Sequence, residues 1–465
     1  MELTPNQYKK HKLSPYLLVL LSFVLIILIG SFLLCIPAAN KSGSWGDYSN
    51  ALFEATSATC VTGLDAYKDG MGGTYTLFGQ IVMAILIQIG GLGFITILAF
   101  FITLFQRNLS FKNRVFLSKA VNSDTIALVG KYVRKLLLAT LIIELIGFGL
   151  GIPVFLTVYD NIGEVCWASL FMSISAFNNA GFDIFGNCSL IRAEGTIFAQ
   201  MPDWAYYYML TYLMILIIMG GISFLTIMDV FSFKKKPKQW RVYTKICLAM
   251  TGILIVVGFL LLLLTDAIPG VKSGYTISPM DAIFTSISAR TAGFATFSMN
   301  TLSVGGRIVT CCLMVIGGCP LGTAGGIKTT TIFIIIVTII CYIRGKKAHA
   351  FNRYFSKNMF IKATFVTMIS LILLLLGYFS LAMFESSNPC YSSENTVLEA
   401  VSAFTNTGFT SGMSTFLSLG GQITCIILMF IGRLGPITFF QLISNNMNKE
   451  ESDKYHYVEE EIIIG

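Results

Sequence analysis

Four short stretches of this chain end in glycine and are rich in serine, threonine and asparagine. They read TSATCVTGL, SISAFNNAGF, SISARTAGF and VSAFTNTGF, and their closing glycines are Gly63, Gly181, Gly293 and Gly408. Successive glycines are 118, 112 and 115 residues apart, far more than a solenoid repeat, so each stretch belongs to a module of its own. Loops of glycine and small residues can present main-chain carbonyl oxygens, and rings of such oxygens can replace the hydration shell of a monovalent cation. The four stretches are therefore candidate cation ligands, provided that the fold brings them together.

The composition places these modules in a membrane. Of the 465 residues, 55% are hydrophobic and 12% are charged, and the mean hydropathy is +0.74. A soluble domain carries about 25% charged residues, so a soluble chain of this composition would expose far too much apolar surface. We therefore predict an all-α polytopic membrane protein. The 11 cysteines form no CxxC pair and the 3 histidines stand apart, so neither a metal cluster nor an organic cofactor is predicted.

Eight apolar segments are long enough to cross a membrane as helices, which takes about 20 residues each. Within each successive pair of segments lies a stretch of about ten residues, too short to span, that leads into one glycine-ended phrase. This order predicts eight transmembrane helices in four span–pore-helix–loop–span repeats around a central pore, with pseudo-fourfold symmetry. The predicted spans are residues 15–38, 76–103, 136–158, 206–230, 246–265, 308–341, 363–384 and 420–444. The predicted short helices are residues 50–58, 167–177, 281–289 and 396–404.

The distribution of lysine and arginine predicts the orientation. The three segments that join the repeats hold 7, 6 and 6 basic residues against a single acid, Asp124, whereas the segments on the other side hold 4 basic and 12 acidic residues. Basic short loops stay in the cytoplasm, so both termini are expected inside, and the four phrases are expected to enter from outside. The net charge of +8 then reports topology, and no nucleic-acid binding is predicted. The expected divisions are a cytoplasmic amino terminus (1–14), repeats at 15–103, 136–230, 246–341 and 363–444, cytoplasmic loops at 104–135, 231–245 and 342–362, and a cytoplasmic tail (445–465).

The glycine-ended phrases are predicted to form a selectivity filter. Non-helical backbone at membrane depth is tolerated only where protein buries it or where it lines water, and four re-entrant loops around one axis meet that condition. Each short helix would also point its carboxyl end, with about half a negative charge, at the centre of the membrane, which favours a cation there. The predicted filter residues are Cys60, Val61, Thr62, Gly63, Asn178, Asn179, Ala180, Gly181, Arg290, Thr291, Ala292, Gly293, Thr405, Asn406, Thr407 and Gly408.

The second span of the third repeat is predicted to be broken. Its run GGCPLGTAGGIKTTT, residues 317–331, holds five glycines, a proline and four threonines, which cannot form a stable helix interior. A flexible loop just below the filter is expected instead. A nucleotide-binding P-loop is not predicted, because Ile327 separates Gly326 from Lys328 and no strand precedes the run. The predicted gate residues are Gly317, Gly318, Gly322, Thr323, Ala324, Gly325, Gly326, Lys328 and Arg433.

Charged residues within the predicted spans are functional candidates, because a charge inside the membrane is costly. Arg433 lies in the middle of the last span, where it could face the pore and repel cations or could be tied to carbonyls of the gate loop. Arg290 stands at the filter and is expected to point away from it, toward an acid or toward carbonyls. Glu144, in the third span, is a candidate partner for some buried group. Asp281, Glu54 and Glu399 are expected in the first turns of short helices, where the helix dipole favours an acid.

The four-repeat pattern with a glycine at each filter position resembles the superfamily of bacterial Trk and Ktr, fungal Trk and plant HKT cation transporters. Eight spans are most similar to the KtrB-type membrane subunit of the Ktr systems, over nearly the whole chain. The run LGTAGGIK, residues 321–328, is similar to the family's intramembrane gate loop, typically GSTAGGIK, and differs at its first two positions. In that family the arginine matching Arg433 sits at the constriction, and glycine at all four filter positions goes with potassium selectivity.

This resemblance implies potassium uptake across the cell membrane through a gated carbonyl filter, often with stimulation by sodium. It also implies a homodimer seated on a cytoplasmic ring of nucleotide-binding, KtrA-like regulatory subunits, with the basic inner loops and the tail from Asn445 as the docking face. Transport of sodium, or of monovalent cations without selectivity, is the alternative, because a carbonyl ring does not by itself rank potassium over sodium.

Two other classes of membrane protein are less consistent with the sequence. An intramembrane enzyme needs a catalytic cluster, but the predicted spans hold no histidine and only two acids, Glu144 and Asp229. The protein is therefore not expected to be an enzyme. An alternating-access transporter of organic solutes favours inverted repeats around a midplane site, whereas the four repeats here each contain two spans and so share one orientation.

Overall fold

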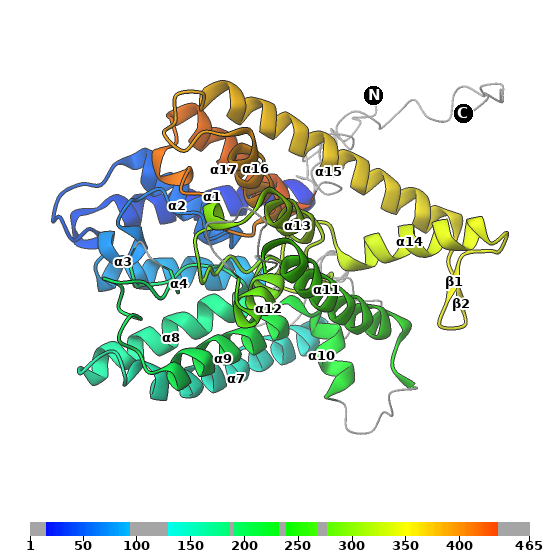
Figure 1. Cartoon of the computed structure of the whole chain (residues 1–465), viewed down its shortest axis with the longest axis horizontal. Coiled ribbons are helices and arrows are strands. Elements are labelled where there is room, and N and C mark those ends of the chain that lie inside the picture. Colours follow the sequence, from blue (N-terminus) through cyan, green and yellow to red (C-terminus); the bar gives the residue numbers. More distant parts are fainter. Residues whose placement is uncertain (1–14, 94–128, 187–188, 232–238, 268–276, 436–465) are drawn as a thin grey trace, which may run out of the picture.

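The computed structural model describes residues 15–93, 129–186, 189–231, 239–267 and 277–435. This part of the chain is mostly helical, and it contains four units that each consist of a long first helix, a short helix and a second helix (Figure 1). The first two units are α1 (Pro15–Cys35), α2 (Tyr48–Cys60) and α4 (Leu77–Leu92), then α7 (Val129–Phe155), α8 (Ile162–Asn178) and α9 (Asp203–Gly221). The last two are α11 (Val242–Asp266), α12 (Pro279–Ser288) and α13 (Val304–Val315), then α15 (Lys357–Phe384), α16 (Ser393–Thr405) and α17 (Leu419–Leu434).

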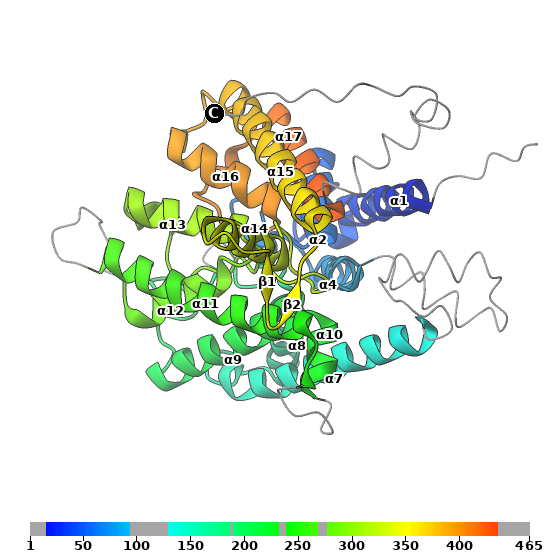
Figure 2. The ribbon, with the colours of Figure 1, turned by 90° about the vertical axis from the view of Figure 1, so that its right-hand side faces the viewer.

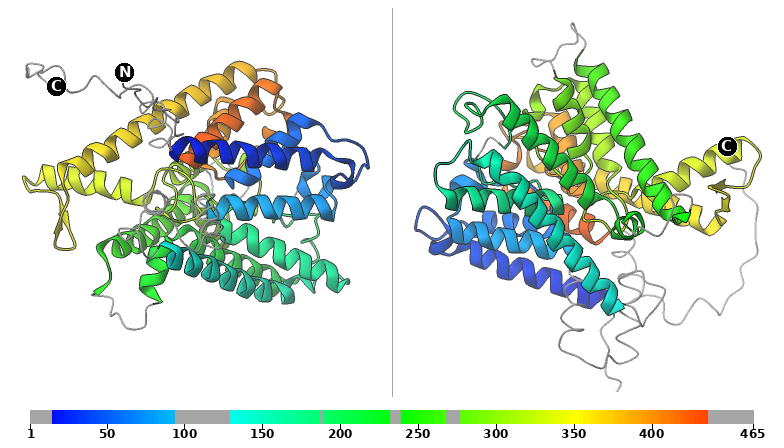
Figure 3. Two further views of the ribbon diagram at one scale, coloured as in Figure 1. Left: turned by 180° about the vertical axis from the view of Figure 1, so that it is seen from behind. Right: turned by 90° about the horizontal axis from the view of Figure 1, so that it is seen from below.

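The four units surround a common centre. In Figure 2 the unit of α15 to α17 lies at the top, that of α1 to α4 at the right, that of α7 to α9 at the bottom and that of α11 to α13 at the left. Each unit packs against the next along the chain, and α17 of the last unit packs against α2 of the first. Seen from behind, the first unit (blue) lies between the last (orange) and the second (cyan) in Figure 3. The units therefore form a closed ring.

A glycine in each first helix allows the second helix of the same unit to pack closely. A Cβ atom built on any of these glycines would lie 2.6 to 2.8 Å from a leucine side chain, which a close-packed interior does not allow. The four pairs are Gly30–Leu86, Gly147–Leu216, Gly258–Leu313 and Gly377–Leu428. Because the same contact recurs in every unit, these glycines align the first helices residue by residue.

The short helices begin at polar residues that suit a helix start. In each one, the side-chain oxygen of the residue before the helix accepts a hydrogen bond from an amide of the first turn, which would otherwise lack a partner. The four bonds run to Asp47 from Ser49, to Asn161 from Gly163, to Ser278 from Asp281 and to Ser392 from Asn395. The predicted short helices are thus found, and each begins two or more residues earlier than hydropathy suggested.

The second span of the third unit is broken, as predicted. Helix α13 ends at Val315 and α14 (Thr329–Ile343) begins 14 residues later, so the glycine-rich run lies between two helices. The prediction of a continuous span over 206–230 is wrong, because α9 is followed by a separate helix, α10 (Phe224–Val230). Its Ser223 caps α10 by accepting from the amide of Leu225 at 3.3 Å, which starts a new helix at that point.

Four described helices are long and apolar enough to cross a membrane, namely the parts at Arg134–Phe155, Asp203–Gly221, Val242–Asp266 and Lys357–Phe384. The other described apolar helices have shorter apolar parts of 10–17 residues, including Leu20–Cys35 of α1. Leu145, Val257 and Leu375 are exposed on α7, α11 and α15, as expected for helix faces that meet lipid rather than water. The inner ends of the predicted spans 76–103 and 420–444 lie outside the described residues.

The remaining described elements are small. Strands β1 (His349–Ala350) and β2 (Arg353–Tyr354) pair antiparallel, with His349 opposite Tyr354. They occupy the segment predicted as a cytoplasmic loop, and α15 begins at Lys357 rather than near residue 363. The other short helices are η1 (Pro37–Ala39), α3 (Gly70–Thr74), η4 (Met299–Thr301) and η5 (Ser414–Phe416).

Candidate functional site

The four glycine-ended loops share one backbone conformation. In each loop the closing glycine has a positive φ angle, of 93°, 73°, 79° and 95° in chain order, and so has the residue two positions before it. The earlier residues are Val61, Asn179, Thr291 and Asn406. An L side chain is strained at positive φ, whereas glycine is not. A pattern repeated at eight positions indicates four copies of one loop shape, including the third copy, which is one residue shorter.

The closing glycines contact one another in a ring. A Cβ atom on Gly63 would lie 2.4 Å from the carbonyl oxygen of Ala180 and 3.1 Å from the Cα atom of Gly181. The same relation links Gly181 to Gly293, Gly293 to Gly408, and Gly408 back to Gly63. The ring therefore closes, with one carbonyl oxygen beside each junction, and it leaves no room for a side chain at any of the four positions.

A serine ties each loop to its own short helix. Its hydroxyl accepts from the amide of the closing glycine in the first and fourth units, and donates to the carbonyl of the following phenylalanine in the second and third. The bonds are Gly63 N to Ser57 Oγ (3.2 Å), Gly408 N to Ser402 Oγ (3.0 Å), Ser175 Oγ to Phe182 O (2.6 Å) and Ser288 Oγ to Phe294 O (2.7 Å). The loop shape is thus held by the serine of the repeated phrase.

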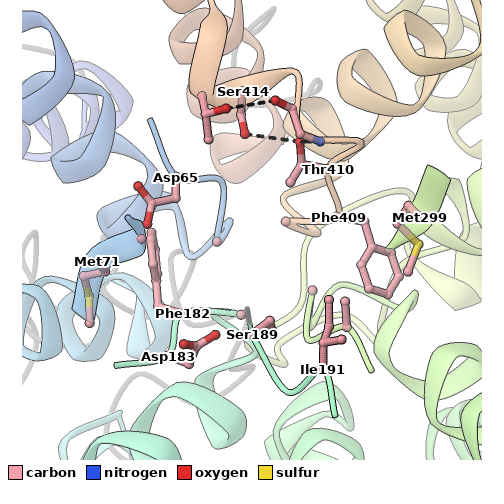
Figure 4. A pocket seen from close by; sticks show the side chains of 18 of the residues that line it. Asp65, Met71, Phe182, Asp183, Ser189, Ile191, Met299, Phe409, Thr410 and Ser414 are labelled. Atoms are coloured by element: carbon pink, nitrogen blue, oxygen red, sulfur yellow. Dashed lines mark hydrogen bonds between the residues drawn. The ribbon is translucent and has the colours of Figure 1, made fainter. Parts of the chain in front are cut away.

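A cavity of about 260 Å³ opens onto the ring and is lined by all four closing glycines. Figure 4 shows its side chains, with Asp65 and Asp183 on loops that follow the first and second glycines and Thr410 on the loop that follows the fourth. The ammonium group of Lys68, which also lines the cavity, lies 4.5 Å from the centre of the Phe416 ring. That cation–π contact holds the positive charge to one side.

The charge of the cavity depends on pH near neutrality. Burial raises the pKa of Asp183 to about 7, against the hydrogen bond from the Phe185 amide at 2.9 Å, which favours the carboxylate. Burial also raises the pKa of Asp65, although its side chain accepts from the Tyr67 amide at 2.7 Å. Both carboxyl groups therefore gain protons at a higher pH than exposed aspartates do.

Residues 316–328 form a loop behind the ring, against the ends of two short helices. The hydroxyl of Thr323 donates to the carbonyl of Phe177 in α8 at 3.3 Å. A Cβ atom on Gly325 would lie 2.2 Å from the carbonyl oxygen of Thr405, the last residue of α16. The loop therefore reaches from the second unit to the fourth and covers the side of the ring opposite the cavity.

Two cationic side chains fasten this loop. The guanidinium group of Arg433 in α17 donates to the carbonyl oxygens of Thr323 in the loop and Gly90 in α4. The ammonium group of Lys328 donates to the carbonyl oxygen of Ala324 at 2.7 Å. Arg433 thus joins the first, third and fourth units, as expected for an arginine tied to gate-loop carbonyls.

The side chain of Arg290 does not enter the ring. It is buried, and its Nη2 atom donates to the hydroxyl of Thr251 in α11 at 3.4 Å. The sequence predicted an acid or a carbonyl group as the hydrogen-bond partner of Arg290. This prediction is wrong for the described residues, because the acceptor there is a hydroxyl group. The Thr251 hydroxyl in turn lies 3.7 Å from the Sγ atom of Cys319, so Arg290 connects the third filter loop with the loop behind it.

Of the three acids predicted in first turns, Asp281 lies there in α12, but the prediction is wrong for Glu54 and Glu399. Both lie halfway along their helices rather than in the first turn, so the helix dipole does not explain them. A carboxyl oxygen of Glu54 accepts from the amide of Ala66 at 2.7 Å, and one of Glu399 accepts from the hydroxyl of Thr410 at 3.0 Å. Each holds the segment that leaves the ring. The missed signal was their spacing, since each precedes its closing glycine by nine residues.

Comparison with known proteins is consistent with this geometry. A family described as TrkH, cation transport protein, matches residues 6–455. The "Potassium/sodium uptake protein NtpJ" of Enterococcus hirae is 32% identical over 98% of this chain and 98% of that protein. The "Ktr system potassium uptake protein B" of Bacillus subtilis is 33% identical, over 98% of this chain and 97% of that protein. In fold, the chain resembles the potassium transporter TrkH from Vibrio parahaemolyticus, with a TM-score of 0.70 at 16% identity over 94% of this chain and 87% of the other.

Proposed function

Because the chain belongs to the TrkH family of cation transport proteins, we propose that it takes up potassium across the cell membrane through the ring of four loops. The observation that carries the proposal is the closed contact of the four glycines, with a carbonyl oxygen at each junction. Such a ring can stand in for water around a monovalent cation. The family consists of transport proteins, so the chain is not an enzyme.

The electrostatic surroundings favour a cation at the ring. Helices α2, α8, α12 and α16 all end there, each with about half a negative charge at its carboxyl end. The cavity in front of the ring carries the carboxyl groups of Asp65 and Asp183, while the nearby ammonium group of Lys68 is held against an aromatic ring. Negative charge around a narrow entrance raises the local concentration of cations.

We assign the filter to the four predicted segments, 60–63, 178–181, 290–293 and 405–408. The preference for potassium rests on the family and on its relatives, whose names describe potassium uptake. Transport of sodium or of monovalent cations without selectivity is the second candidate, because the name of the Enterococcus hirae relative includes both ions.

We assign the gate to the loop of residues 317–328 together with Arg433. The loop covers the ring from behind, and Arg433 and Lys328 add two positive charges where a cation leaves the ring. Like charges repel strongly where water is scarce. Conduction would therefore require the loop to move aside, with the bond between Arg433 and the Thr323 carbonyl as the natural point of release.

The membrane arrangement and the partners follow from the same proposal. The four repeats follow the predicted order, although the first helices of the last three begin earlier than predicted, at Val129, Val242 and Lys357. Both termini and the basic loops would lie in the cytoplasm, since basic loops are retained there. The relatives named as parts of a Ktr system support a multi-component assembly, and we propose a homodimer on a KtrA-like cytoplasmic ring. Stimulation by sodium would then be a property of this assembly.

The direct test is uptake of rubidium, as a tracer for potassium, into proteoliposomes that hold the purified chain, with sodium varied outside. We expect uptake that resists a tenfold excess of sodium. The variant Gly63→Ser should lower the potassium-to-sodium ratio about tenfold, equivalent to about 1.4 kcal/mol, because its Cβ atom would push against the carbonyl of Ala180, 2.4 Å away.

The matched control is Gly43→Ser, which also has positive φ, at 66°, but nothing within 4 Å of a new Cβ atom. It should leave the ratio unchanged, which separates crowding of the ring from backbone strain. Equal uptake of sodium and potassium by the unaltered chain would favour the unselective alternative. No cation uptake at all would overturn the proposal.

A further inference from the structure

Two of the four filter segments carry an asparagine at the position where the backbone is left-handed. These are Asn179 in the second unit and Asn406 in the fourth, whereas the first and third units have Val61 and Thr291 there. A positive φ angle favours asparagine over most other residues, but in this protein a valine and a threonine adopt it as well, at 59° and 76°. The conformation alone therefore does not explain the two asparagines, which lie in opposite units of the ring.

The side chain of Asn406 is buried and fastens the fourth segment on two sides. Its amide nitrogen donates to the main-chain carbonyl oxygen of Met429 in α17 at 3.0 Å, and to the hydroxyl oxygen of Thr62 in the first segment at 2.9 Å. Both hydrogens of the amide are thus used. One bond holds the segment to the second helix of its own unit, and the other joins it to the neighbouring segment of the ring.

Asn179 makes the equivalent contact in the second unit. Its side chain is also buried, and in the orientation that satisfies both ends of the amide group, the nitrogen donates at 3.1 Å to the carbonyl oxygens of Ile217 in α9 and Ala176 in α8. Ile217 and Met429 occupy matching positions in the second helices, three residues before the runs GGIS and GRLG. The same main-chain acceptor is therefore used in both units, and we call this contact the asparagine tie.

The first and third units hold their segments differently. The side chain of Val61 cannot donate a hydrogen bond, and it packs in an apolar cluster with Ile87, which occupies the matching position of α4. The hydroxyl of Thr291 is buried and has no partner among the described residues. At the matching position of α13, the carbonyl oxygen of Met314 lies against Gly326 of the loop behind the ring. The asparagine ties thus give the fourfold ring a twofold pattern.

The ties act next to the atoms that would face the ion. The residues that follow the two asparagines, Ala180 and Thr407, supply the carbonyl oxygens at two junctions of the glycine ring, beside Gly63 and Gly293. Because neighbouring residues share a rigid peptide unit, a side chain held at the asparagine limits the movement of the carbonyl group that follows. The asparagine side chains themselves are bonded to the surrounding helices, so they are positioning residues.

We propose that Asn179 and Asn406 hold the second and fourth filter segments back from the axis and thereby set the selectivity for potassium over sodium. This deepens the proposed filter function and rests on it. Sodium is the smaller ion, so the carbonyl ring has to contract before it can replace the hydration shell of sodium. A ring kept at its width favours the larger ion, and a segment tied to its second helix resists the contraction.

The experiment measures the potassium-to-sodium uptake ratio in proteoliposomes of the full chain, after each asparagine is replaced by the valine that the first unit has at this position. Asn179→Val and Asn406→Val should each lower the ratio about tenfold, as expected for the loss of buried hydrogen bonds, while rubidium uptake persists because the ring remains. Thr291→Val removes a hydroxyl that has no partner among the described residues, so its effect on the ratio should stay below about twofold.

Asn352→Val is the control for a valine in the left-handed conformation, because Asn352 has a φ angle of 60° and is exposed in the turn between β1 and β2. It should keep the ratio of the unaltered chain. Asn406→Gly removes the tie without backbone strain, and it should lower the ratio as Asn406→Val does.

A normal ratio in the valine variants at the two asparagines would overturn the proposal, as would an equal fall in Thr291→Val. A normal ratio in Asn406→Gly would also overturn it, because backbone strain would then explain the valine result. If the valine variants fail to fold, Asn406→Gly decides alone. Failure of the filter proposal would look different, because the unaltered chain would then show no preference for potassium.

Discussion

The glycine ring and the layer behind it differ in symmetry. In the ring itself, all four units contribute the end of a short helix, the same pair of positive φ angles and a serine that holds the loop, accepting a hydrogen bond in two units and donating one in the other two. Behind the ring the described parts of the units differ, because the third is interrupted by a long loop, and the fourth carries Arg433 where the other three have Gly91, Gly221 and Gly318. The fourfold pattern thus holds for one layer of the molecule and fails in the next.

This difference follows from what each layer has to do. A ring of carbonyl ligands needs an equal contribution from every unit, since one misplaced oxygen leaves a gap in the coordination of the ion. A barrier needs one obstruction only, and a single unit can supply it. The remaining units then only have to provide partners for the obstruction, as Gly90 of the first unit does by accepting from Arg433.

The largest effect on transport is expected when one unit of the ring is made unlike the other three. Gly293→Ala would place a Cβ atom 2.1 Å from the Thr407 carbonyl oxygen, at a φ of 79° where an L residue is strained by about 1–2 kcal/mol. We expect nearly complete loss of rubidium uptake, at least about a hundredfold in rate, equivalent to about 2.7 kcal/mol. The same measurement on Gly149→Ala, a helical position with nothing within 4 Å, should give normal uptake. Normal uptake by Gly293→Ala would mean that the ring tolerates inequality.

A smaller effect is expected behind the ring, where one residue carries the asymmetry. Arg433→Ala removes the bonds to Thr323 and Gly90 together with a positive charge on the exit path. We expect basal rubidium leak to rise about tenfold, because the loop loses its fastening, while the potassium-to-sodium ratio stays the same. Arg344→Ala, at an exposed position after α14, is the matched control and should not leak. A changed ratio in Arg433→Ala would show that the two layers are not independent.

Sequence reasoning was most effective where the units repeat. The four phrases predicted the short helices, and the run of five glycines predicted the broken span, because periodicity and helix-breaking residues are local signals. The break between α9 and α10 was missed, since the run Gly220-Gly221-Ile222-Ser223 looks like an ordinary site of close helix packing. The additional helix starts there because the Ser223 hydroxyl caps it.

The contacts between units could not be predicted from local sequence patterns. The sequence marked Arg290, Arg433 and Glu144 as buried charges, but it could not identify their partners, which are at least 34 residues away and lie in other helices or in the loop behind the ring. Glu54 and Glu399 were assigned to helix starts because the predicted short helices began too late. When tertiary packing brings two distant residues together, the spacing of residues along the chain does not reveal the contact.

The smallest effect is expected on the cavity side of the ring, from changing Asp183. This acid is not repeated in all four units. Its pKa is raised to about 7 by burial, so the carboxylate prevails above that pH and is lost as the external pH falls through it. Loss of the charge lowers the local cation concentration, and we expect the half-saturating concentration of rubidium to rise about twofold between pH 8 and pH 6. Asp183→Asn should show the higher value throughout and no pH dependence over that range, whereas Asp203→Asn, at an exposed aspartate paired with Arg192, should keep the dependence. Because a single carboxyl group changes the supply of ions and not their coordination, the potassium-to-sodium ratio should be identical in all three proteins, and a ratio that changes in Asp183→Asn would place this acid in the ring layer after all.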